Sequence, residues 1–266
     1  MTGSSMLDAM IAAARLAGES LSNDLNRPDL LEVREKAASD FVTSADLRSE
    51  AILRSALSAA FPDHVLVMEE SDRVDAPNVA GRPRLLVDPL DGTTNFLHGI
   101  PHFAVAIARE LDGDITAGVV LDVPKDELFW VERGRGAWVG DRRLSVSTKH
   151  DLTQAIVATG IPHHNRGDHP AYLAALERIM GRVAGIRRFG AATLDLAYVA
   201  AGRFASFFEL DLAPWDVAAG ALMVREAGGV VTDTRGGPMR PKDILASSGE
   251  DVHREMLESL RPLHRD

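Results

Sequence analysis

The segment 85–96 places two carboxylates where an apolar run ends. It reads Leu-Leu-Val-Asp-Pro-Leu-Asp-Gly-Thr-Thr-Asn-Phe, so the run leads directly into Asp88, and Asp91 follows three residues later. Pro89 is expected to end the strand, and Gly92 permits a turn or a close approach of backbone to a ligand. Hard cations such as Mg2+ take oxygen ligands of this kind, together with phosphate and water. If Gly92 opens a helix, the N–H groups there could also bind a phosphate.

Acidic residues stand at the edges of two further apolar elements. Glu69 and Glu70 follow the apolar run 65–68, and Asp216 lies in the first turn of a predicted helix that begins near Pro214. Each place has an ordinary explanation, because turns are rich in Asp, Pro and Gly, and an acid in a first helical turn complements the helix dipole. Three such places in one chain favour a shared metal site.

Charge and composition limit the classes of partner. The chain has 266 residues, with 29 Lys and Arg against 39 Asp and Glu, for a formal net charge of −10. This balance argues against nucleic-acid binding, which needs a basic face, but a carboxylate-rich pocket can still take an anion through bound cations. The lack of cysteine excludes disulfides, thiolate catalysis and Cys-ligated zinc. Residues 1–14 have no basic region before their apolar residues, so we expect no signal peptide, no membrane span and a cytoplasmic location.

Apolar spacing predicts two different arrangements of elements. In the first half we expect helices at 6–21 and 45–60, a short junction at 40–43, and strands at 65–68, 85–87, 103–108, 115–121 and 128–131. From about residue 147 strands and helices alternate, with strands at 156–159, 204–208 and 230–231 and helices at 168–180, 191–201, 215–227 and 250–260. We therefore predict an N-terminal α+β part over 1–145 and a C-terminal α/β part over 146–266.

Four motifs together resemble the signatures of the inositol monophosphatase family. The segment Asp88–Phe96 is similar to its first signature, and Trp215-Asp-Val-Ala-Ala-Gly220, followed by Glu-Ala-Gly-Gly, is similar to its second. Asp40-Phe-Val-Thr-Ser-Ala-Asp46 resembles the upstream Asp-x-Val-Thr-x-x-Asp motif, and Glu69-Glu70-Ser71 resembles the Glu-Glu-Ser motif. The motifs occur in the family order, and the similarity covers essentially the whole chain.

The resemblance implies a layered αβαβα sandwich of the α/β (α+β) class, a homodimer, and two to three Mg2+ ions per subunit. The implied metal ligands are Glu69, Asp88, Asp91, Asp216 and the carbonyl of Leu90. The implied catalytic residues are Asp46, Glu69 and Thr93, of which Asp46 and Thr93 orient and deprotonate the attacking water. The implied substrate contacts are Leu90, Asp91, Gly92, Thr93, Gly190, Ala191, Ala192, Glu209 and Asp216. Among these, Glu209 is expected to accept a hydrogen bond from a hydroxyl of the polyol.

The implied reaction is hydrolysis of myo-inositol 1-phosphate, or of a related polyol monophosphate, through in-line displacement at phosphorus by metal-activated water. Histidinol phosphate, 3′-phosphoadenosine 5′-phosphate and fructose 1,6-bisphosphate stay open as alternative substrates. A non-catalytic binding or regulatory descendant is a further alternative, although the complete acidic set speaks against it. Lithium sensitivity follows from the same resemblance. We expect the histidines at the surface or in hydrogen bonds, since Mg2+ prefers oxygen ligands, and Lys36 either near the phosphate or in a solvated loop.

Overall fold

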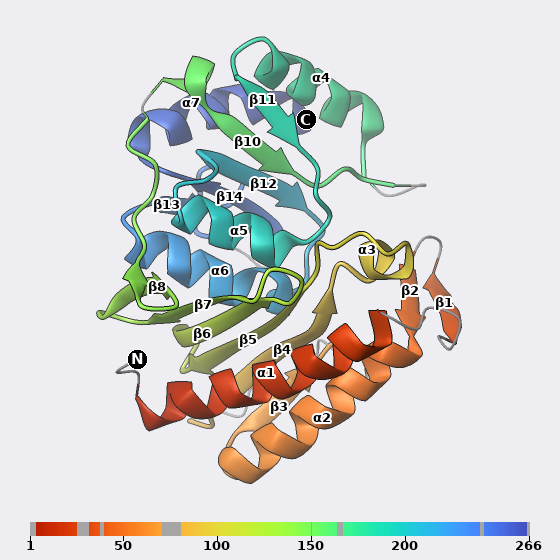
Figure 1. Ribbon diagram of the computed structural model, residues 1–266. Coiled ribbons are helices and arrows are strands. Elements are labelled where there is room, and N and C mark those ends of the chain that lie inside the picture. Colours follow the sequence, from red (N-terminus) through yellow and green to blue (C-terminus); the bar gives the residue numbers. More distant parts are fainter. Residues whose placement is uncertain are drawn as a thin grey trace.

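The computed structural model describes residues 4–25, 32–37, 40–70, 81–149, 151–163, 167–239 and 242–264. Its elements form five layers in the order helices, sheet, helices, sheet, helices (Figure 1). The αβαβα arrangement expected from the resemblance is thus confirmed. No helix within these ranges is long and apolar enough to cross a bilayer.

Two long helices, α1 (Ser5–Leu25) and α2 (Ser44–Ala60), form the first layer. Apolar residues recur along α1 at helical spacing, so that one face is buried from Leu7 to Leu21. This face packs with α2 against the first sheet. Both helices agree closely with the predicted ranges.

A capping box fixes the start of α2. The Thr43 hydroxyl accepts a hydrogen bond from the Asp46 N–H, and the Asp46 carboxylate accepts one from the Thr43 N–H. Just before the helix, β1 (Val33–Ala37) pairs antiparallel with β2 (Asp40–Thr43). The segment 40–43 is therefore a strand and not the junction that we expected. A short strand with mixed polarity has no alternation by which it could be recognised.

The described residues place seven strands in the first sheet, and their spatial order follows the chain. β3 and β4 are parallel, and the other neighbours are antiparallel. Helices cover both faces, so alternate residues of a strand enter different cores: Ala104, Ala106 and Ala108 face the middle helices, while Val105 and Ile107 face the first layer. The strands are β3 (Val65–Met68), β4 (Arg84–Asp91), β5 (Ala104–Leu111), β6 (Asp114–Asp122), β7 (Glu127–Glu132), β8 (Gly136–Val139) and β9 (Arg142–Arg143).

A bulge interrupts β4 at its acidic end. Asp88 pairs with Ala106 and Asp91 pairs with Ala104, so β4 carries one more residue here than β5 does. The expectation that Pro89 ends the strand is wrong, because β4 continues to Asp91. Proline has no N–H for the ladder, and the bulge is a place where none is needed.

The second sheet contains five strands within the described residues, in the order β11-β10-β12-β14-β13. β10 is parallel to both β11 and β12, whereas β14 is antiparallel to β12 and β13. The strands are β10 (Ile156–Thr159), β11 (Gly185–Arg187), β12 (Ser206–Leu210), β13 (Val230–Thr232) and β14 (Asp243–Ser247).

The remaining helices form the middle layer and the outer layer (Figure 1). α5 (Ala192–Ala200) and α6 (Pro214–Glu226) lie between the sheets, and α4 (His169–Met180) and α7 (Glu250–Leu260) cover the outer face of the second sheet. The short helix α3 (Thr93–Leu97) follows β4 directly. Single turns of 3-10 helix occur at Leu152–Gln154 and Arg261–His264.

Small residues allow the middle helices to pack closely. A Cβ on Gly220 of α6 would lie 2.4 Å from the Cβ of Leu196 on α5, and a Cβ on Gly118 of β6 would lie 2.9 Å from the Cα of Ala219. Side chains from both sheets and both middle helices share one apolar core. The two halves of the chain therefore pack through a common core, and the domain boundary near residue 145 stays a prediction.

Candidate active site

Asp88 lies at the centre of a group of acidic side chains. It is buried, and burial together with the charges of Glu69, Asp91 and Asp216 raises the pKa of its carboxyl well above the usual range. Its Oδ1 accepts a hydrogen bond from the Leu90 N–H at 3.0 Å. One oxygen is therefore bound by the chain itself, and the other can bind a ligand.

Asp91 follows the bulge and is anchored to the start of α5. Its Oδ2 accepts hydrogen bonds from the N–H of Thr193 at 2.8 Å and from the Thr193 hydroxyl at 2.5 Å. Burial raises the pKa of Asp91 to about 6, although the hydrogen bonds from Thr193 act in the opposite direction. The contact joins β4 of the first half to α5 of the second half.

Asp216 occupies the first turn of α6. Its Oδ2 accepts a hydrogen bond from the Ala213 N–H at 2.7 Å, which fixes the carboxylate at the helix N-terminus. Burial raises the pKa of Asp216 well above its usual range, and the charges of Asp91, Glu69 and Glu209 raise it further. The carboxylates of Asp216, Asp91, Glu69 and Glu209 therefore act on one another through their charges.

One turn of α2 supports this acidic group from the side of the first layer. Ser49 donates a buried hydrogen bond of 2.7 Å to the carbonyl of Pro89, inside the bulge. Glu50, also buried, accepts a hydrogen bond of 2.8 Å from the N–H of Glu70, in the turn that carries Glu69. Neither residue was predicted, because a polar residue on a helix gives no sign in the sequence of what it contacts.

Asp46 and Thr93 are brought into contact although they lie 47 positions apart. The Thr93 hydroxyl is 3.0 Å from Asp46 Oδ1 and 3.1 Å from the Leu90 carbonyl oxygen, and its single proton can bond to only one of them at a time. Asp46 Oδ2 accepts hydrogen bonds from the Thr43 N–H and hydroxyl. Burial raises the pKa of Asp46, opposed by these hydrogen bonds.

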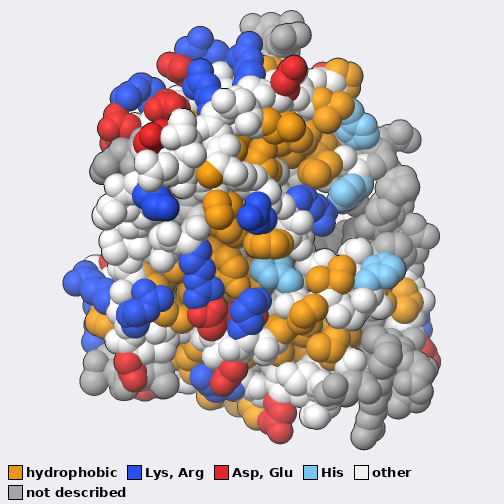
Figure 2. Space-filling view, turned by 45° about the horizontal axis from the view of Figure 1, so that its top comes forward, with side chains coloured by type: hydrophobic (Ala, Val, Ile, Leu, Met, Phe, Trp, Pro, Cys, Tyr) orange, Lys and Arg blue, Asp and Glu red, His pale blue; other side chains and the backbone are white. Residues whose placement is uncertain are grey.

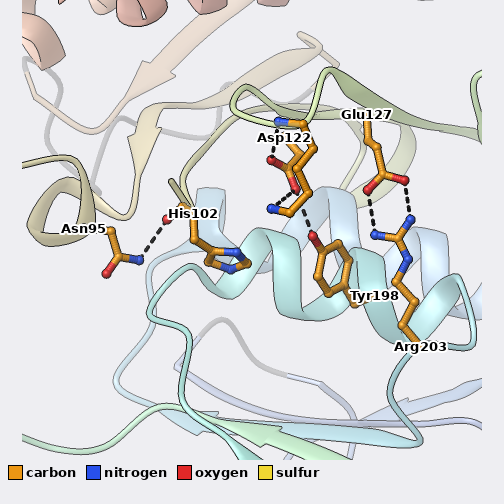
Figure 3. A network of polar contacts seen from close by, with 7 residues as sticks. Asn95, His102, Asp122, Glu127, Tyr198 and Arg203 are labelled. Atoms are coloured by element: carbon orange, nitrogen blue, oxygen red, sulfur yellow. Dashed lines mark hydrogen bonds and ion pairs between the residues drawn. The ribbon is translucent and has the colours of Figure 1, made fainter. Parts of the chain in front are cut away.

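The first signature packs closely against the loop after α3 and against the segment before α5. Gly92 has φ of 93°, and a Cβ there would lie 3.1 Å from the His102 carbonyl oxygen and 3.4 Å from that of Gly190. The side-chain amide of Asn95 donates to the carbonyls of His102 at 2.8 Å and Phe189 at 2.7 Å. Figure 3 shows Asn95 directed at the His102 carbonyl. This amide therefore connects the first signature to the segment 189–192.

The ring of His102 differs from expectation. It is buried against Phe189 and Tyr198, and its Nε2 has no partner among the described residues. Burial lowers the pKa of His102 to about 4, so the ring is neutral and acts in packing. Tyr198 in turn donates to Asp122, which also pairs with Lys125, so α5 is attached to β6 (Figure 3).

The Glu209 side chain, near the end of β12, packs against the backbone of Gly160. A Cβ on Gly160 would lie 1.9 Å from the carboxyl carbon of Glu209, so only glycine leaves room for that side chain. Burial, and then the charge of Asp91, raise the pKa of Glu209 to about 8. It lines a pocket of about 650 Å3 with Thr94, Asp216, Arg188, His163 and Tyr172.

A second buried acid lies near Glu209. The pKa of Asp195, on α5, is raised well above the usual range by burial and by the charges of Glu209 and Asp91, and its Oδ1 has no partner among the described residues. Sequence reasoning missed Asp195 and Thr193. They fall three and five positions after Gly190, in a stretch that offers polar side chains at the start of an apolar helix.

The expected residues are distributed as follows. Asp46 and Thr93 are in contact, and the carboxylates of Glu69, Asp88, Asp91 and Asp216 interact through their charges. Gly190 and Ala191 lie just before α5, and Ala192 is its first residue. Trp215 is buried in the core. The side chains of Lys36 and Asp40, and residues Ser71 and His164, lie outside what the structure describes.

The donor set of this group suits a hard cation. All the charged side chains concerned are carboxylates, and the carbonyl of Leu90 is a further oxygen. No three acidic or histidine side chains of the described residues already surround one point at coordinating distance. Asp88, Asp91 and Asp216 each have one oxygen in a hydrogen bond with the backbone, so the other oxygen of each carboxylate can bind a cation.

Comparison with known proteins decides the family. Residues 3–264 match the profile of the Inositol monophosphatase family. The chain belongs to the inositol monophosphatase family. It is 49% identical over 266 residues to the Inositol-1-monophosphatase of Rhizobium meliloti (strain 1021), covering 99% of both chains. It is 42% identical over 258 residues to the Nus factor SuhB of Escherichia coli (strain K12), covering 96% of both.

The fold of a solved relative agrees with this assignment. The extragenic suppressor protein suhB from Bartonella henselae is 47% identical, with a TM-score of 0.92, and the match covers 97% of this chain and 99% of that one. As a member of the inositol monophosphatase family, the chain is an enzyme of the phosphatase class, and the family is metal-dependent.

Proposed function

We propose that the chain is a Mg2+-dependent phosphomonoesterase that hydrolyses myo-inositol 1-phosphate and related polyol monophosphates to the polyol and phosphate. The observation that carries the proposal is the acidic group around Asp88, to which Glu69, Asp91 and Asp216 contribute, beside the Asp46–Thr93 contact. The relative from Rhizobium meliloti named Inositol-1-monophosphatase supports the substrate, since it is 49% identical over nearly the full chain.

Two to three Mg2+ ions per subunit would bind among the carboxylates. Glu69, Asp88 and the Leu90 carbonyl are proposed for the first ion, Asp88, Asp91 and Asp216 for the second, and Glu69 again for a weaker third. Buried carboxylates whose charges raise each other's pKa are costly without a neutralising cation. When bound, such ions lower the pKa of water and offset the charge of the phosphate and the leaving oxygen.

Asp46 and Thr93 are proposed to orient and deprotonate the attacking water. When the Thr93 hydroxyl donates to Asp46 Oδ1, its oxygen lone pairs are directed away from Asp46 and can accept a proton from that water. Asp46 is kept in place because its other oxygen is bonded to Thr43. Glu69, which follows β3, is proposed as the third catalytic residue.

Two walls are proposed to bind the substrate. The N–H groups of Gly92 and Thr93 would contact the phosphate, with Leu90, Asp91 and Asp216 beside it. The polyol would lie against Gly190, Ala191 and Ala192, with a hydroxyl donating to Glu209. Cations that offset the charge of Asp91 also lower the pKa of Glu209, and so favour its ionised, hydrogen-bond-accepting form.

The test is a turnover panel with purified protein in EDTA and in excess Mg2+. Inositol 1-phosphate, histidinol phosphate, 3′-phosphoadenosine 5′-phosphate and fructose 1,6-bisphosphate are compared through kcat/KM. We expect the highest value for inositol 1-phosphate and no turnover in EDTA. Turnover that persists in EDTA would refute the metal proposal, and a higher kcat/KM for one of the other esters would replace the substrate.

A homodimer in the cytoplasm completes the proposal. Apolar side chains near the site are exposed, including Ile100, Ile161 and Phe189 at 48, 40 and 37%. Figure 2 shows a face of the molecule on which hydrophobic and histidine side chains gather, as at many subunit interfaces. Light scattering coupled to size exclusion should give twice the chain mass of 28.7 kDa. A monomer at micromolar concentration would contradict this. The acidic net charge gives no support to nucleic-acid binding.

A further inference from the structure

The carboxylate of Glu209 lies against backbone that carries no side chain. β10 and β12 are parallel neighbours, and the pairing of Thr159 with Phe208 is the last of their ladder. Gly160 and Glu209 follow this pair. A Cβ on Gly160 would lie within 2.5 Å of the carboxyl carbon and of both carboxyl oxygens of Glu209. The position of the Gly160 backbone therefore limits the position of the Glu209 carboxylate.

Two hydroxyl groups bind the carbonyl oxygen of Gly160. The Tyr172 hydroxyl is 2.7 Å from this oxygen and the Thr159 hydroxyl is 2.9 Å from it, and the two hydroxyl oxygens are 2.9 Å apart. A carbonyl oxygen has two lone pairs, so it can accept from both hydroxyls. Tyr172 and Thr159 are buried, and hydrogen bonds in such surroundings are stronger than in water. The backbone at Gly160 is therefore fixed by side-chain hydroxyls.

Tyr172 contributes its hydrogen bond from the outer helix layer. It lies in α4, 12 positions after Gly160, whereas Thr159 directly precedes Gly160. The Tyr172 ring packs against Phe208, the residue before Glu209, with the ring centroids 6.1 Å apart. Burial raises the pKa of the Tyr172 hydroxyl above its ordinary value, so this group keeps its proton and remains a donor. One side chain of α4 therefore contacts the ends of both β10 and β12.

We propose that Tyr172 is a positioning residue for substrate recognition, because its hydrogen bond to the Gly160 carbonyl fixes the backbone against which the Glu209 carboxylate lies. The inference rests on the proposed function, in which Glu209 accepts a hydrogen bond from a hydroxyl of the polyol. Tyr172 takes no part in the reaction at phosphorus. Through Tyr172, the outer helix α4 contributes to the choice of substrate as well as covering the second sheet.

The chain has two tyrosines, and the second one provides a matched control. Tyr198 is also buried, and its hydroxyl donates from α5 to Asp122 at 2.9 Å. It does not belong to the described residues that line the pocket of Glu209. Tyr172→Phe and Tyr198→Phe each remove a buried hydroxyl and keep the ring, but only Tyr172→Phe removes a hydrogen bond to Gly160.

The experiment measures kcat and KM for inositol 1-phosphate and for p-nitrophenyl phosphate at saturating Mg2+, in the native protein and in both variants. The quantity compared is the kcat/KM for inositol 1-phosphate divided by that for p-nitrophenyl phosphate. Tyr172→Phe should lower this ratio roughly three- to tenfold, the size of one hydrogen bond between uncharged groups, and mainly through the KM for inositol 1-phosphate. Tyr198→Phe should leave the ratio at the native value.

Combination with Glu209→Gln tests whether Tyr172 acts through Glu209. The fall in the ratio caused by Tyr172→Phe should disappear when Glu209→Gln is already present, because the effects of residues in one network are not additive. Gly160→Ala disturbs the same contact in a different way, since its Cβ would occupy the place of the Glu209 carboxylate. It should lower the ratio at least as much as Tyr172→Phe does.

Three results would overturn the inference. An unchanged ratio in Tyr172→Phe would mean that Gly160 keeps its position without Tyr172. An equal fall in Tyr198→Phe would make the loss a general effect of a missing buried hydroxyl. A full additional loss in the double variant would mean that Tyr172 acts by a route other than Glu209. The proposed function survives all three results if the native protein hydrolyses inositol 1-phosphate; if it does not, the proposed function fails and this inference fails with it.

Discussion

Replacing Asp91 with asparagine should stabilise the protein when no divalent cation is present. Asp91 is partly buried and receives two hydrogen bonds from Thr193. An asparagine side chain at this position would have nearly the same shape, and its amide oxygen could still accept the N–H of Thr193. The change therefore removes a buried charge while leaving the main anchor to α5 in place.

The direction and size of the expected change in the free energy of unfolding follow from the pKa of Asp91, which burial raises from 3.8 to about 6. The folded chain then binds the proton more tightly than the unfolded chain, so the free energy of unfolding decreases as pH rises through this interval. Above about pH 6 Asp91 is ionised in the folded chain, and the ionised carboxylate lowers the free energy of unfolding by its full amount. At 1.36 kcal/mol per pH unit this amount is roughly 3 kcal/mol. It is an upper value, because Asp88 and Asp216 can take up protons when Asp91 ionises.

The assay is urea unfolding in EDTA near pH 7.5 and near pH 5. Asp91→Asn should exceed the native protein in free energy of unfolding by about 1–3 kcal/mol at the higher pH, and by less at the lower pH. Asp114→Asn is the control. Asp114 is exposed, and its hydrogen bond to Arg133 lowers its pKa, so removing its charge should give no gain.

Excess Mg2+ should reverse the order of stability, because the native protein gains the free energy of binding a cation that the variant binds poorly. Turnover should be lost in the variant. If Asp91→Asn is no more stable than the native protein in EDTA at pH 7.5, the ionised carboxylate of Asp91 does not destabilise the folded chain. Native-like turnover in the variant would remove Asp91 from the proposed ligands.

Three further outcomes are expected. Glu209→Gln should lower kcat/KM for inositol 1-phosphate roughly ten- to a hundredfold. It should barely change the hydrolysis of p-nitrophenyl phosphate, which has no ring hydroxyl. Equal losses on both esters would assign Glu209 to the metal site or the fold. Ser49→Ala leaves the Pro89 carbonyl without its hydrogen-bond donor. The Mg2+ concentration for half-maximal turnover should therefore rise about tenfold or more. An unchanged Mg2+ titration would show that the bulge does not need Ser49. Li+ in the millimolar range should inhibit uncompetitively, as the family resemblance implies, and turnover unaffected by Li+ at limiting Mg2+ would show a different second metal site.

Periodicity in the sequence was enough to predict most of the fold. The long helices α1 and α2 and the apolar strands such as β4 and β6 were predicted because their burial patterns extend over many residues. The strands that were not predicted, β1, β2, β8, β9, β11 and β14, have two to five residues and depend on neighbours for their hydrogen bonds. The end of β4 was misplaced because proline at a bulge and proline at a strand end look the same in sequence.

Only those residues of the candidate site that belong to a recognisable motif could be predicted from the sequence. Asp88, Asp91 and Asp216 stand at the ends of apolar elements, and the resemblance supplied their expected roles. Ser49 and Asp195 carry no such mark, because their roles come from contacts with residues that are far away in the sequence. Such contacts exist only after the two sheets have packed on the middle helices.

The close approach of α5 and α6 also bears on how such a site changes during evolution. Gly220 and Asp216 are one turn apart on α6, and Leu196 and Thr193 are one turn apart on α5. Because Gly220 meets Leu196 without space for a methyl group, the separation of Asp216 from the anchor of Asp91 is set by a residue with no functional group. A substitution there would move two carboxylates apart without altering either one. Selection on the spacing of these acids therefore acts on an inert position that a comparison of catalytic residues would overlook.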